Sequence, residues 1–430
     1  MADLIALSTR FIDSGVLDEA ANRITHELSE LGNGIAVVEA FSHSVLFETD
    51  EGLLAFDASG GMGGDRVVRA ARGWSDARFH TLVYTHGHID HVGGSGYFKA
   101  DATARGLEAP RVVAHENVSR RFERYELTNG YNLTINDRQF RGFARHGYGI
   151  GGDRHFLPQD VLQVDTDYRD QLAVSVGDLA FELNHARGET DDHSWAWIPS
   201  KKVICAGDFF IWNFPNAGNP QKVQRYPSDW AKALRAMAAR GAELFIPAHG
   251  LPIAGAERIA LVLNEVATTL ENLVSAVLLQ MNEGACLNDI LHSVSVPKEI
   301  LEKPYLVPLY DEPEFVIRNI WRLYGGWYDG NPAHLKPASD AALGAELAAL
   351  SGGAQALAKR ASELADAGDL RLACHLIELA SAADPGDREL QARRAVIYQK
   401  RRETERSLMA KGIYGYVAGE ARDRANGEGD

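Results

Sequence analysis

Cysteine is scarce in this sequence, with three residues that lie far apart at Cys205, Cys286 and Cys374. They form no CxxC pair and no even-numbered framework, so a disulfide-stapled scaffold is excluded and a reducing compartment is favoured. The first six residues lack the basic and apolar stretches of a signal peptide. No run approaches the roughly 20 apolar residues of a membrane span. We therefore expect a cytoplasmic protein.

Basic residues are also in deficit. Lys and Arg number 44 against 59 Asp and Glu, for a formal net charge of −15. A phosphate backbone attracts basic surfaces, so this balance argues against nucleic-acid binding. The same charge opposes adsorption to anionic membranes. We expect neither nucleic acid nor a membrane as a partner. With 45% hydrophobic residues, a chain of this length can form two or three domains with sizeable cores.

Strand-like and helix-like segments alternate up to about residue 255, which is the pattern of an α/β domain. Short β-branched or apolar runs predict strands, and amphipathic runs predict helices. Residues 126–160 are rich in Gly, Asn, Asp and aromatic residues without a clear period, so we expect a long irregular, functional segment there. The predicted strands span residues 35–38, 44–48, 53–57, 81–85, 111–114, 172–186, 195–206 and 243–247, and the predicted helices span 65–72 and 230–239.

The character of the chain changes after residue 255. Residues 256–282 and 314–324 show helical periodicity. From residue 338 the chain is rich in Ala and Leu with charged faces and shows no strand signal. Within this part, residues 370–380 and 388–400 predict a helix–turn–helix that resembles a single tetratricopeptide unit. We predict a catalytic α/β domain over residues 1–255, a helical extension over 256–337 and an all-α domain over 338–430.

The segment from Thr85 to His91 reads Thr-His-Gly-His-Ile-Asp-His and carries the strongest chemical signal in the chain. It follows an apolar strand directly. His86 and His88 occupy alternate positions at the strand end and so project toward one side, whereas the next turn brings Asp90 and His91 to a second point nearby. Imidazole and carboxylate ligands suit zinc, with iron or manganese as alternatives. The pattern predicts two neighbouring metal positions.

Further ligands must come from distant segments. Asp208 follows the apolar run 203–205, and His249 follows the predicted strand 243–247. Each is a weak signal alone, but their order and their common position at strand ends indicate one convergent site. The Gly-containing turn within residues 184–193 offers the remaining candidates, which are His185, Glu189, Asp191, Asp192 and His193.

Together, the HxHxDH motif, a ligand in a Gly-containing turn, a Gly-Asp pair and a late His resemble the metallo-β-lactamase superfamily. The resemblance implies an αββα sandwich with two metal ions, expected to be Zn²⁺, with Fe or Mn as alternatives. It also implies that Asp208 bridges the ions. The first ion would be bound by His86, His88 and the turn ligand, and the second by Asp90, His91 and His249.

The turn reads Arg-Gly-Glu-Thr over residues 187–190, with Glu189 where the superfamily usually has His. Alkyl sulfatases of this fold carry Glu there. Residues 312–332 and 338–425 are similar to the segment after their catalytic domain and to their helical dimerisation domain. The resemblance implies a homodimer, with the arm of residues 290–330 crossing to the partner. It does not extend to the sterol-carrier-like third domain of those enzymes. His193 is the alternative ligand at the first ion, and His185 is expected to be structural.

The sulfate-binding Arg of those sulfatases has no match in register here. It lies in the loop after the bridging carboxylate, and the corresponding loop, residues 209–226, offers Lys222 and Arg225 as candidate anion ligands. Asn216 in the same loop and Tyr131 in the irregular segment are candidate substrate contacts. Three further histidines are expected at the surface, namely His115, His146 and His155.

Two divalent ions lower the pKa of a shared water toward neutrality, so the expected nucleophile is a metal-bridging hydroxide. Asp90 and Asp208 are the expected proton acceptors, because both carboxylates should lie beside it. The expected substrate is a small-molecule ester, and a sulfate ester is the first hypothesis. Hydrolysis of a lactone, carboxylic ester or phosphate ester on the same centre is the second hypothesis, and a non-catalytic metal-binding scaffold is the third.

Overall fold

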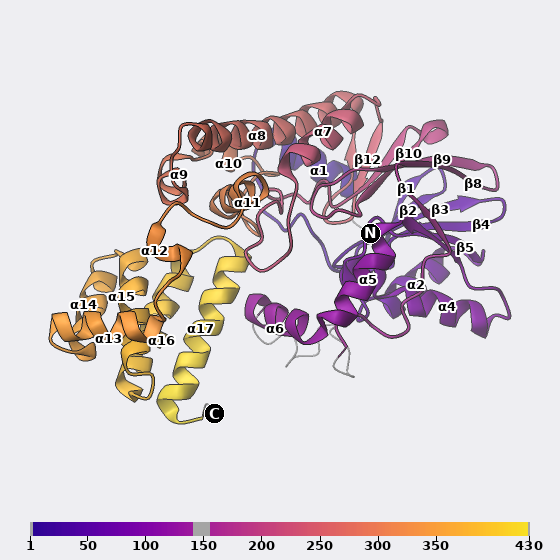
Figure 1. Ribbon diagram of the computed structural model, residues 1–430. Helices are drawn as coiled ribbons and strands as arrows, with labels where there is room; N and C mark the ends of the chain where they lie inside the picture. The colour runs from indigo at the N-terminus through magenta and orange to yellow at the C-terminus, as the bar shows by residue number, and fades with distance from the viewer. Residues whose placement is uncertain (1–2, 141–154, 429–430) are drawn as a thin grey trace. The chain divides into compact units, whose positions relative to one another are not determined.

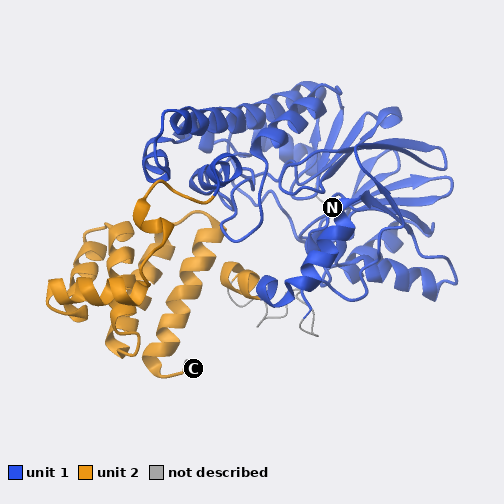
Figure 2. Cartoon of the chain, viewed as in Figure 1, with its two compact units in different colours: residues 1–133, 144–326 blue, residues 134–143, 327–430 orange. Residues whose placement is uncertain are grey.

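The computed structural model describes residues 3–140 and 155–428 (Figure 1). Two units pack separately. The first comprises residues 1–133 and 144–326, and the second comprises residues 134–143 and 327–430 (Figure 2). The domain division predicted at residues 255 and 337 stays a prediction. In packing terms, the helices that follow residue 255 belong to the first unit as far as residue 326.

The first sheet has seven strands among the described residues, in sequential order from β1 to β7. Strands β1 to β4 pair antiparallel, whereas β4 to β7 pair in parallel. Parallel strands run in the same direction and need a crossover connection. The carboxyl ends of β4, β5 and β6 therefore lie at the same edge. The strands are β1 (Leu28–Gly32), β2 (Ile35–Val38), β3 (Ser44–Thr49), β4 (Gly52–Phe56), β5 (Phe79–Val83), β6 (Arg111–His115) and β7 (Thr166–Tyr168).

The second sheet has the strand order β13-β12-β11-β10-β9-β8 in the described part of the chain. Only β11 and β12 pair in parallel, and the other neighbours are antiparallel. The short 3₁₀ helix η1 (Pro199–Lys201) turns the chain from β10 into β11. The strands are β8 (Gln171–Val176), β9 (Leu179–His185), β10 (Ser194–Ile198), β11 (Val203–Gly207), β12 (Leu244–Pro247) and β13 (Ile253–Ala254).

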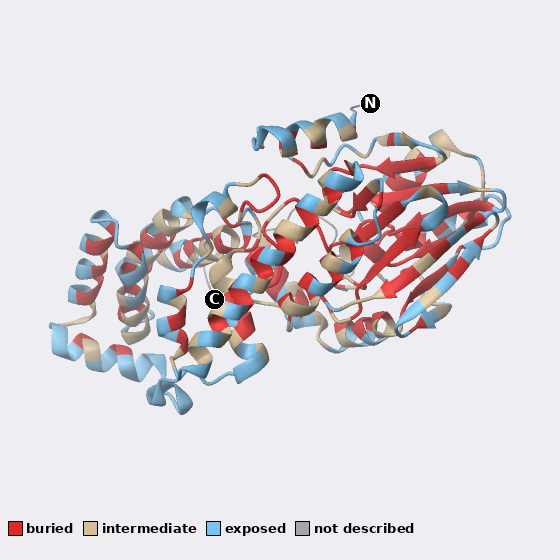
Figure 3. Ribbon diagram, turned by 90° about the horizontal axis from the view of Figure 1, so that it is seen from above, coloured by how far each residue is buried: buried red, intermediate tan, exposed pale blue. Residues whose placement is uncertain are grey.

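Alternate residues of the strands fill the space between the two sheets. On β2, Ile35 and Val37 belong to this inner core, whereas Ala36 and Val38 pack with the helices outside the first sheet. The period of two follows from the pleat of a β-strand. Phe181 of β9 contributes to the same inner core from the second sheet, and the strands are largely buried (Figure 3).

Helices cover the outer face of each sheet (Figure 1). Their buried residues recur at helical spacing, as Trp230, Leu234 and Met237 do on α7. The predicted αββα sandwich is therefore confirmed. The first sheet is covered by α2 (Gly64–Trp74), α4 (Ser95–Ala104) and α5 (Asn117–Leu127), and the second by α1 (Leu4–Ser14), α7 (Pro227–Ala238), α8 (Ala256–Asn282) and α11 (Pro313–Gly325), with α9 (Leu287–Ser293) and α10 (Lys298–Leu301) following α8.

Helix α8 has the bounds predicted from its periodicity. By length and composition alone it could cross a membrane, but half of its most apolar stretch is buried inside the protein. Leu263, Val266 and Leu270 are buried at spacings of three and four residues, in the same core as α7 and α11. This packing accounts for the apolar composition of α8 as that of a core helix.

The segment 126–160 differs from the prediction of irregular structure, because its first part is helical. Helix α5 continues to Leu127, and α6 spans Asn129–Phe140. The buried residues of α6 are Asn132, Ile135, Asn136 and Gln139. Their spacing is that of a helix face, but three of the four are amides, so hydrophobic periodicity could not reveal it. Residues 141–154, including His146, lie outside the described residues.

The second unit is helical throughout its described part after residue 327. The predicted helix–turn–helix is confirmed as α15 and α16, and the turn is fixed where Asp387 accepts from the backbone N–H groups of Glu389 and Leu390. Further helices surround this pair. The helices are α12 (Pro332–Leu335), α13 (Asp340–Ser351), α14 (Ala354–Asp366), α15 (Leu370–Ala383), α16 (Arg388–Thr404) and α17 (Leu408–Asn426).

Replacing Phe181 by Ala tests the inner core, because this buried ring meets Phe56 edge-on with ring centroids 5.8 Å apart. We expect the free energy of unfolding to fall by about 3–5 kcal/mol, since the smaller side chain leaves a cavity. Urea unfolding followed by tryptophan fluorescence measures the change. The control is Leu127→Ala at an exposed site, which should change the free energy by less than about 0.5 kcal/mol. Equal midpoints for the two variants would contradict this packing.

Candidate metal centre

Strand ends bring the candidate ligands to one edge of the sandwich. His86 follows β5, Asp208 directly follows β11, and His249 follows β12. Glu189 lies in the loop that joins β9 to β10. The carboxyl ends of parallel neighbours lie together, so β11 and β12 place Asp208 beside His249. Helix α3 (Ile89–Val92), which carries Asp90 and His91, begins immediately after His88.

The described residues contain two groups of potential metal-binding side chains. Within each group, the ligand atoms all lie within 4.8 Å of one another. The seven residues are those chosen from the sequence, and the structure brings all of them together, although their role as ligands stays a prediction. The first group is His86, His88, Glu189 and Asp208, and the second is Asp90, His91 and His249.

Asp208 lies between the two groups. Its Oδ2 atom is 3.8 Å from His86 Nε2 and 3.4 Å from His91 Nε2. Its Oδ1 atom is 3.5 Å from His249 Nε2. The loop can take this position because Gly207 has a φ of 54°, and a Cβ there would lie 2.7 Å from the His193 ring. The carboxylate of Asp208 can therefore bind an ion in either group.

Unpartnered buried atoms support a metal at this place. His91 Nε2, Asp208 Oδ1 and Glu189 Oε2 have no hydrogen-bond partner among the described residues. Buried polar groups are nearly always paired, and each exception needs an explanation. His86 Nε2 and His88 Nδ1 also lie only 2.8 Å apart. Imidazole nitrogens and carboxylate oxygens are the donors that zinc prefers, so these residues fit a divalent cation.

Asp57 orients His91 and is a functional residue that the sequence analysis missed. Its Oδ2 atom accepts from His91 Nδ1 at 2.8 Å, which orients the ring so that Nε2 faces Asp208. Thr85 donates to the same carboxylate through both its backbone N–H and its hydroxyl, each at 2.8 Å. The available signal was a carboxylate at the end of the predicted strand 53–57.

Charge around the centre sets its protonation before any ion binds. Burial raises the pKa of Asp208, but His91 and His249 offset this and keep the pKa well below its usual range. Burial also raises the pKa of Asp90, and the same two imidazoles reverse the shift. Burial lowers the pKa of His91, but Asp208 and Asp57 raise it well above the ordinary value. The site thus holds two carboxylates and an imidazolium.

Glu189 is bound by two neighbours that were predicted to contact substrate. Arg225 forms an ion pair with Glu189 Oε1 at 2.8 Å, and Asn216 Nδ2 donates to the same oxygen at 2.5 Å. Arg225 is only 1% exposed, and its Nη1 atom pairs with Glu189 while its Nε atom has no hydrogen-bond partner among the described residues. Burial raises the pKa of Glu189 to about 8 despite the opposing effect of Arg225. Both neighbours therefore orient the carboxylate, and its Oε2 atom stays open to an ion.

His193, the alternative first-ion ligand, has a different hydrogen bond in the structure. Its Nε2 atom accepts from the backbone N–H of Asp208 at 3.0 Å. Burial lowers the pKa of this imidazole to about 3, so the ring is neutral. It stacks on Phe209 with ring centroids 4.3 Å apart. This geometry makes His193 a support for the Asp208 loop.

A buried ion pair anchors the histidine loop. Arg121 of α5 donates to both oxygens of Asp192, at 2.6 and 2.9 Å, and to Asp191 at 2.5 Å. Asp192 also accepts from the backbone N–H of Gly87 at 3.0 Å. Arg121 holds the pKa of Asp192 at about 2, against the opposing effect of burial. The two aspartates are therefore scaffold residues, which the sequence left open as ligands.

Other predicted residues have mixed outcomes. His185 lies stacked on His115 with ring centroids 3.7 Å apart, and its Nδ1 contacts the carbonyl of His193. The surface placement predicted for His115 is wrong, because the residue is buried. His155 is exposed as predicted. Tyr131 lies exposed on α6, where its substrate contact stays a prediction.

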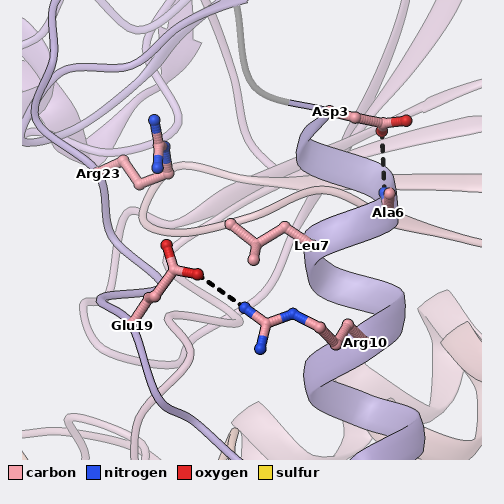
Figure 4. A pocket seen from close by; sticks show the side chains of 6 residues that line it. All are labelled: Asp3, Ala6, Leu7, Arg10, Glu19 and Arg23. Carbon is pink, nitrogen blue, oxygen red and sulfur yellow. Dashed lines mark hydrogen bonds and ion pairs between the residues drawn. The ribbon is translucent and has the colours of Figure 1, made fainter.

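A surface hollow of about 500 Å³ lies on the same unit, beside α1 (Figure 4). Arg10 pairs with Asp18 and Glu19, and Arg23 pairs with Glu39. The two arginines that line the hollow are thus paired within the protein. The lining residues do not form a catalytic group. The lining residues are Asp3, Ala6, Leu7, Arg10, Glu19 and Arg23.

Comparison with known families agrees with this geometry. The metallo-beta-lactamase superfamily model matches residues 37–249, which span the sandwich from β2 to His249. This part of the chain therefore resembles that superfamily in both sequence and fold. The alkyl sulfatase dimerisation family model matches residues 286–424. The chain thus matches a metallo-beta-lactamase model and an alkyl sulfatase dimerisation model one after the other.

Individual relatives match most of the chain at low identity. A linear primary-alkylsulfatase of Pseudomonas is 25% identical over 364 residues, which cover 81% of this chain and 68% of the relative. An (R)-specific secondary-alkylsulfatase of Pseudomonas is 25% identical, over 82% of this chain and 56% of the relative. The structure of a stereoselective inverting sec-alkylsulfatase from Pseudomonas superposes with a TM-score of 0.80 at 22% identity, covering 93% of this chain and 66% of the other. This likeness shows the shared fold.

Replacing Glu189 by Gln distinguishes the two candidates for the first ion. The neutral amide is a weaker metal ligand, so we expect the affinity for one of two ions to fall about 10- to 100-fold or more. His193→Gln should retain both ions. Metal content after dialysis, measured by inductively coupled plasma mass spectrometry, checks both results. The matched control is Glu182→Gln, on the adjacent strand β9, where the carboxylate pairs with Arg240. Retention of two ions by Glu189→Gln together with loss of one by His193→Gln would reverse the assignment.

Metal binding to the metal-free protein should release protons. The pKa of Glu189 is raised to about 8 and that of His91 lies well above its ordinary value, so both carry a proton at pH 7. A ligand must lose its proton to bind a metal, so the apparent affinity should rise as the pH increases toward and through these pKa values. Calorimetric titration in buffers of different ionisation enthalpy counts the protons. An affinity that is the same at pH 6 and pH 8 would contradict this protonation state.

Proposed function

We propose that this protein hydrolyses sulfate esters at a centre that binds two divalent metal ions. The observation that carries the proposal is the convergence of two ligand groups on Asp208, with Glu189 completing the first. The alkylsulfatases among the relatives, and the matching dimerisation segment, favour a sulfate ester over other substrates. Zinc is the proposed metal, because imidazoles and carboxylates together suit it, and iron and manganese are alternatives.

A pair of such ions, when bound, lowers the pKa of a coordinated water and polarises the oxygen of an ester. The protein's own contribution is the placement of bases and charge. Asp90 Oδ2 and Asp208 Oδ1 both lie beside His249 Nε2, at 3.4 and 3.5 Å. Their pKa values are lowered, so both are ionised at neutral pH. Either carboxylate can accept the proton of the attacking water.

Lys222 is the proposed ligand for the anionic part of the substrate. Burial lowers the pKa of its ammonium to about 7, with Arg225 adding to the effect and Asp90 and Glu189 opposing it. The effects of Asp90 and Glu189 on its pKa support a position of Lys222 within electrostatic range of these two candidate ligands. Its Nζ atom also lies 5.8 Å from the centroid of the Phe156 ring. Lys222 and Arg225 are the two candidate anion ligands of this loop, and Lys222 is favoured because Arg225 already pairs with Glu189.

The wider biological setting rests on the same proposal. A homodimer formed through the region that matches the dimerisation family is the expected assembly. The crossing arm of residues 290–330 and a cytoplasmic location stay predictions. Hydrolysis of a lactone, a carboxylic ester or a phosphate ester uses the same centre and is the alternative activity. A metal-binding scaffold does not require carboxylates that are ionised beside an open metal position.

The activity is tested with purified protein that has been loaded with zinc. We expect sulfate release from a panel of primary and secondary alkyl sulfates, measured by ion chromatography. Asp208→Asn should lower kcat by about 10²- to 10⁴-fold, because it removes a proton acceptor and a metal ligand. The control Asp178→Asn changes a carboxylate at the β8–β9 turn, which accepts from the backbone N–H of Asp50. Lactone opening without any sulfate release would support the alternative activity.

Lys222 is tested by the substitution Lys222→Met, which removes the charge and retains much of the side-chain volume. We expect KM for an alkyl sulfate to rise about 10-fold or more, since a charged hydrogen bond contributes about 1.5–3 kcal/mol. Lys222→Arg should restore part of the loss. Steady-state kinetics with an alkyl sulfate and with an uncharged acetate ester of the same alkyl group provides the comparison. Equal effects on the two substrates would show that Lys222 does not bind the anion.

A further inference from the structure

The supports of Glu189 are themselves bound by residues outside the metallo-β-lactamase match. Arg225 and Asn216 lie in the loop that follows β11, within residues 37–249. Asp311 and Asn319, which bind this loop, lie within the segment that matches the dimerisation family, residues 286–424. All four residues belong to the first unit. The contacts therefore connect the segment that matches the dimerisation family with Glu189, a candidate metal ligand within the metallo-β-lactamase match.

Asn319 of α11 binds the backbone of Arg225 from both sides. Its Nδ2 atom donates to the Arg225 carbonyl at 2.9 Å, and its Oδ1 atom accepts from the Arg225 N–H at 3.3 Å. The same Oδ1 accepts from Gln224 Nε2 at 3.0 Å. Asn319 is 3% exposed, so water cannot replace these bonds easily. The backbone position from which Arg225 reaches Glu189 is fixed by this one amide.

Asp311 fixes the other support. Its Oδ2 atom accepts from the backbone N–H groups of Gly218 and Asn219, at 2.6 and 3.1 Å. These residues directly follow Asn216 and Ala217. Gly218 lies against the start of α11 so closely that a Cβ would be 2.5 Å from the backbone of Phe315. Asp311 is completely buried. It therefore determines where the Asn216 amide meets Glu189.

We propose that Asn319 and Asp311 are positioning residues for Glu189 and thereby set the affinity of the first metal position. The inference rests on the proposed metal-dependent function. Glu189 Oε1 receives its two donors from Arg225 and Asn216, and each donor is fixed by one residue of the 311–319 segment. If either anchor is lost, the carboxylate can turn away from His88, whose Nδ1 atom lies 3.6 Å from Glu189 Oε1. His91 and His249 have other supports, so the second position should not respond.

The test compares zinc affinities of the full-length protein and its variants in competition with a chelator of known affinity. Orienting groups around a metal ligand typically contribute 10- to 100-fold in affinity. We expect Asn319→Ala and Asp311→Asn to weaken one of two binding steps about 10-fold and to leave the other within about twofold. The matched control is Asn264→Ala on α8, where the amide accepts from Arg235 at 2.6 Å, away from the loop. It should change neither step.

A double-mutant cycle shows whether Asn319 acts through Glu189. If it does, adding Asn319→Ala to Glu189→Gln should cause no further loss at the weakened step, because coupled residues are not additive. Full additivity, or equal weakening of both steps, would overturn the inference and indicate a general structural role. If Asn319→Ala does not fold, Asp311→Asn is placed in the same cycle and decides the result.

The outcomes separate this inference from the proposed function. A wild-type protein that binds no transition metal would contradict the function itself. A wild-type protein that binds two ions, with both steps unchanged in Asn319→Ala and Asp311→Asn, would overturn only the positioning role. Selective weakening of one step in both variants supports it.

Discussion

The structure depends on the burial of opposite charges against one another at the ends of strands. Asp57, Glu189, Asp192 and Asp208 are all nearly inaccessible to water, and an isolated buried carboxylate is strongly unfavourable. Each is matched by a specific cation or donor set, such as Arg121 for Asp192. Removing one partner of such a pair leaves an uncompensated charge. The buried carboxylates of the centre therefore depend on specific partners, and different carboxylates have different partners.

Within the metal centre, Glu189 would make the first proposed metal position chemically different from the second. A neutral imidazole needs only a correct ring orientation, which a single hydrogen bond can supply. A carboxylate adds a negative charge and a rotatable end, so it requires compensation and two points of attachment. Arg225 supplies the charge and Asn216 supplies the second attachment. The loop that carries them is long enough to need external anchoring, and α11 provides it.

Much of the fold and of the grouping of the candidate ligands could be predicted from the sequence, because both depend on local patterns. Periodicity predicts the strands and α8. The spacing of the HxHxDH motif predicts that its side chains group at two neighbouring points. The supports could not be predicted in the same way. Arg121 and Asp192 are 71 residues apart, and no local pattern reveals such a pair. Arg225 shows a related difficulty, since a loop arginine suggests an anion ligand and its ion pair with Glu189 is revealed only by the structure.

Helix α6 shows a further limit of hydrophobic patterning. Its buried face presents mainly amides, which satisfy hydrogen bonds inside the protein but look solvent-exposed in a sequence. The same property hides Asn319 within α11, where it is buried between Val316 and Ile320 in an otherwise apolar stripe. Buried amides of this kind specify one arrangement of neighbouring segments, because a shifted arrangement would leave their hydrogen-bonding groups unsatisfied.

The attachment of ligands to separate strand ends has a consequence for how such a protein can diversify. His86, Asp208 and His249 are positioned by β5, β11 and β12, which are fixed by the two packed sheets. Exposed connections between these strands, such as residues 103–109, carry none of these atoms, and insertions are tolerated at such surface positions. The loop after β11 is different, because it is largely buried and supports Glu189. Change can therefore accumulate in the exposed connections while the strand ends that carry these side chains stay in place.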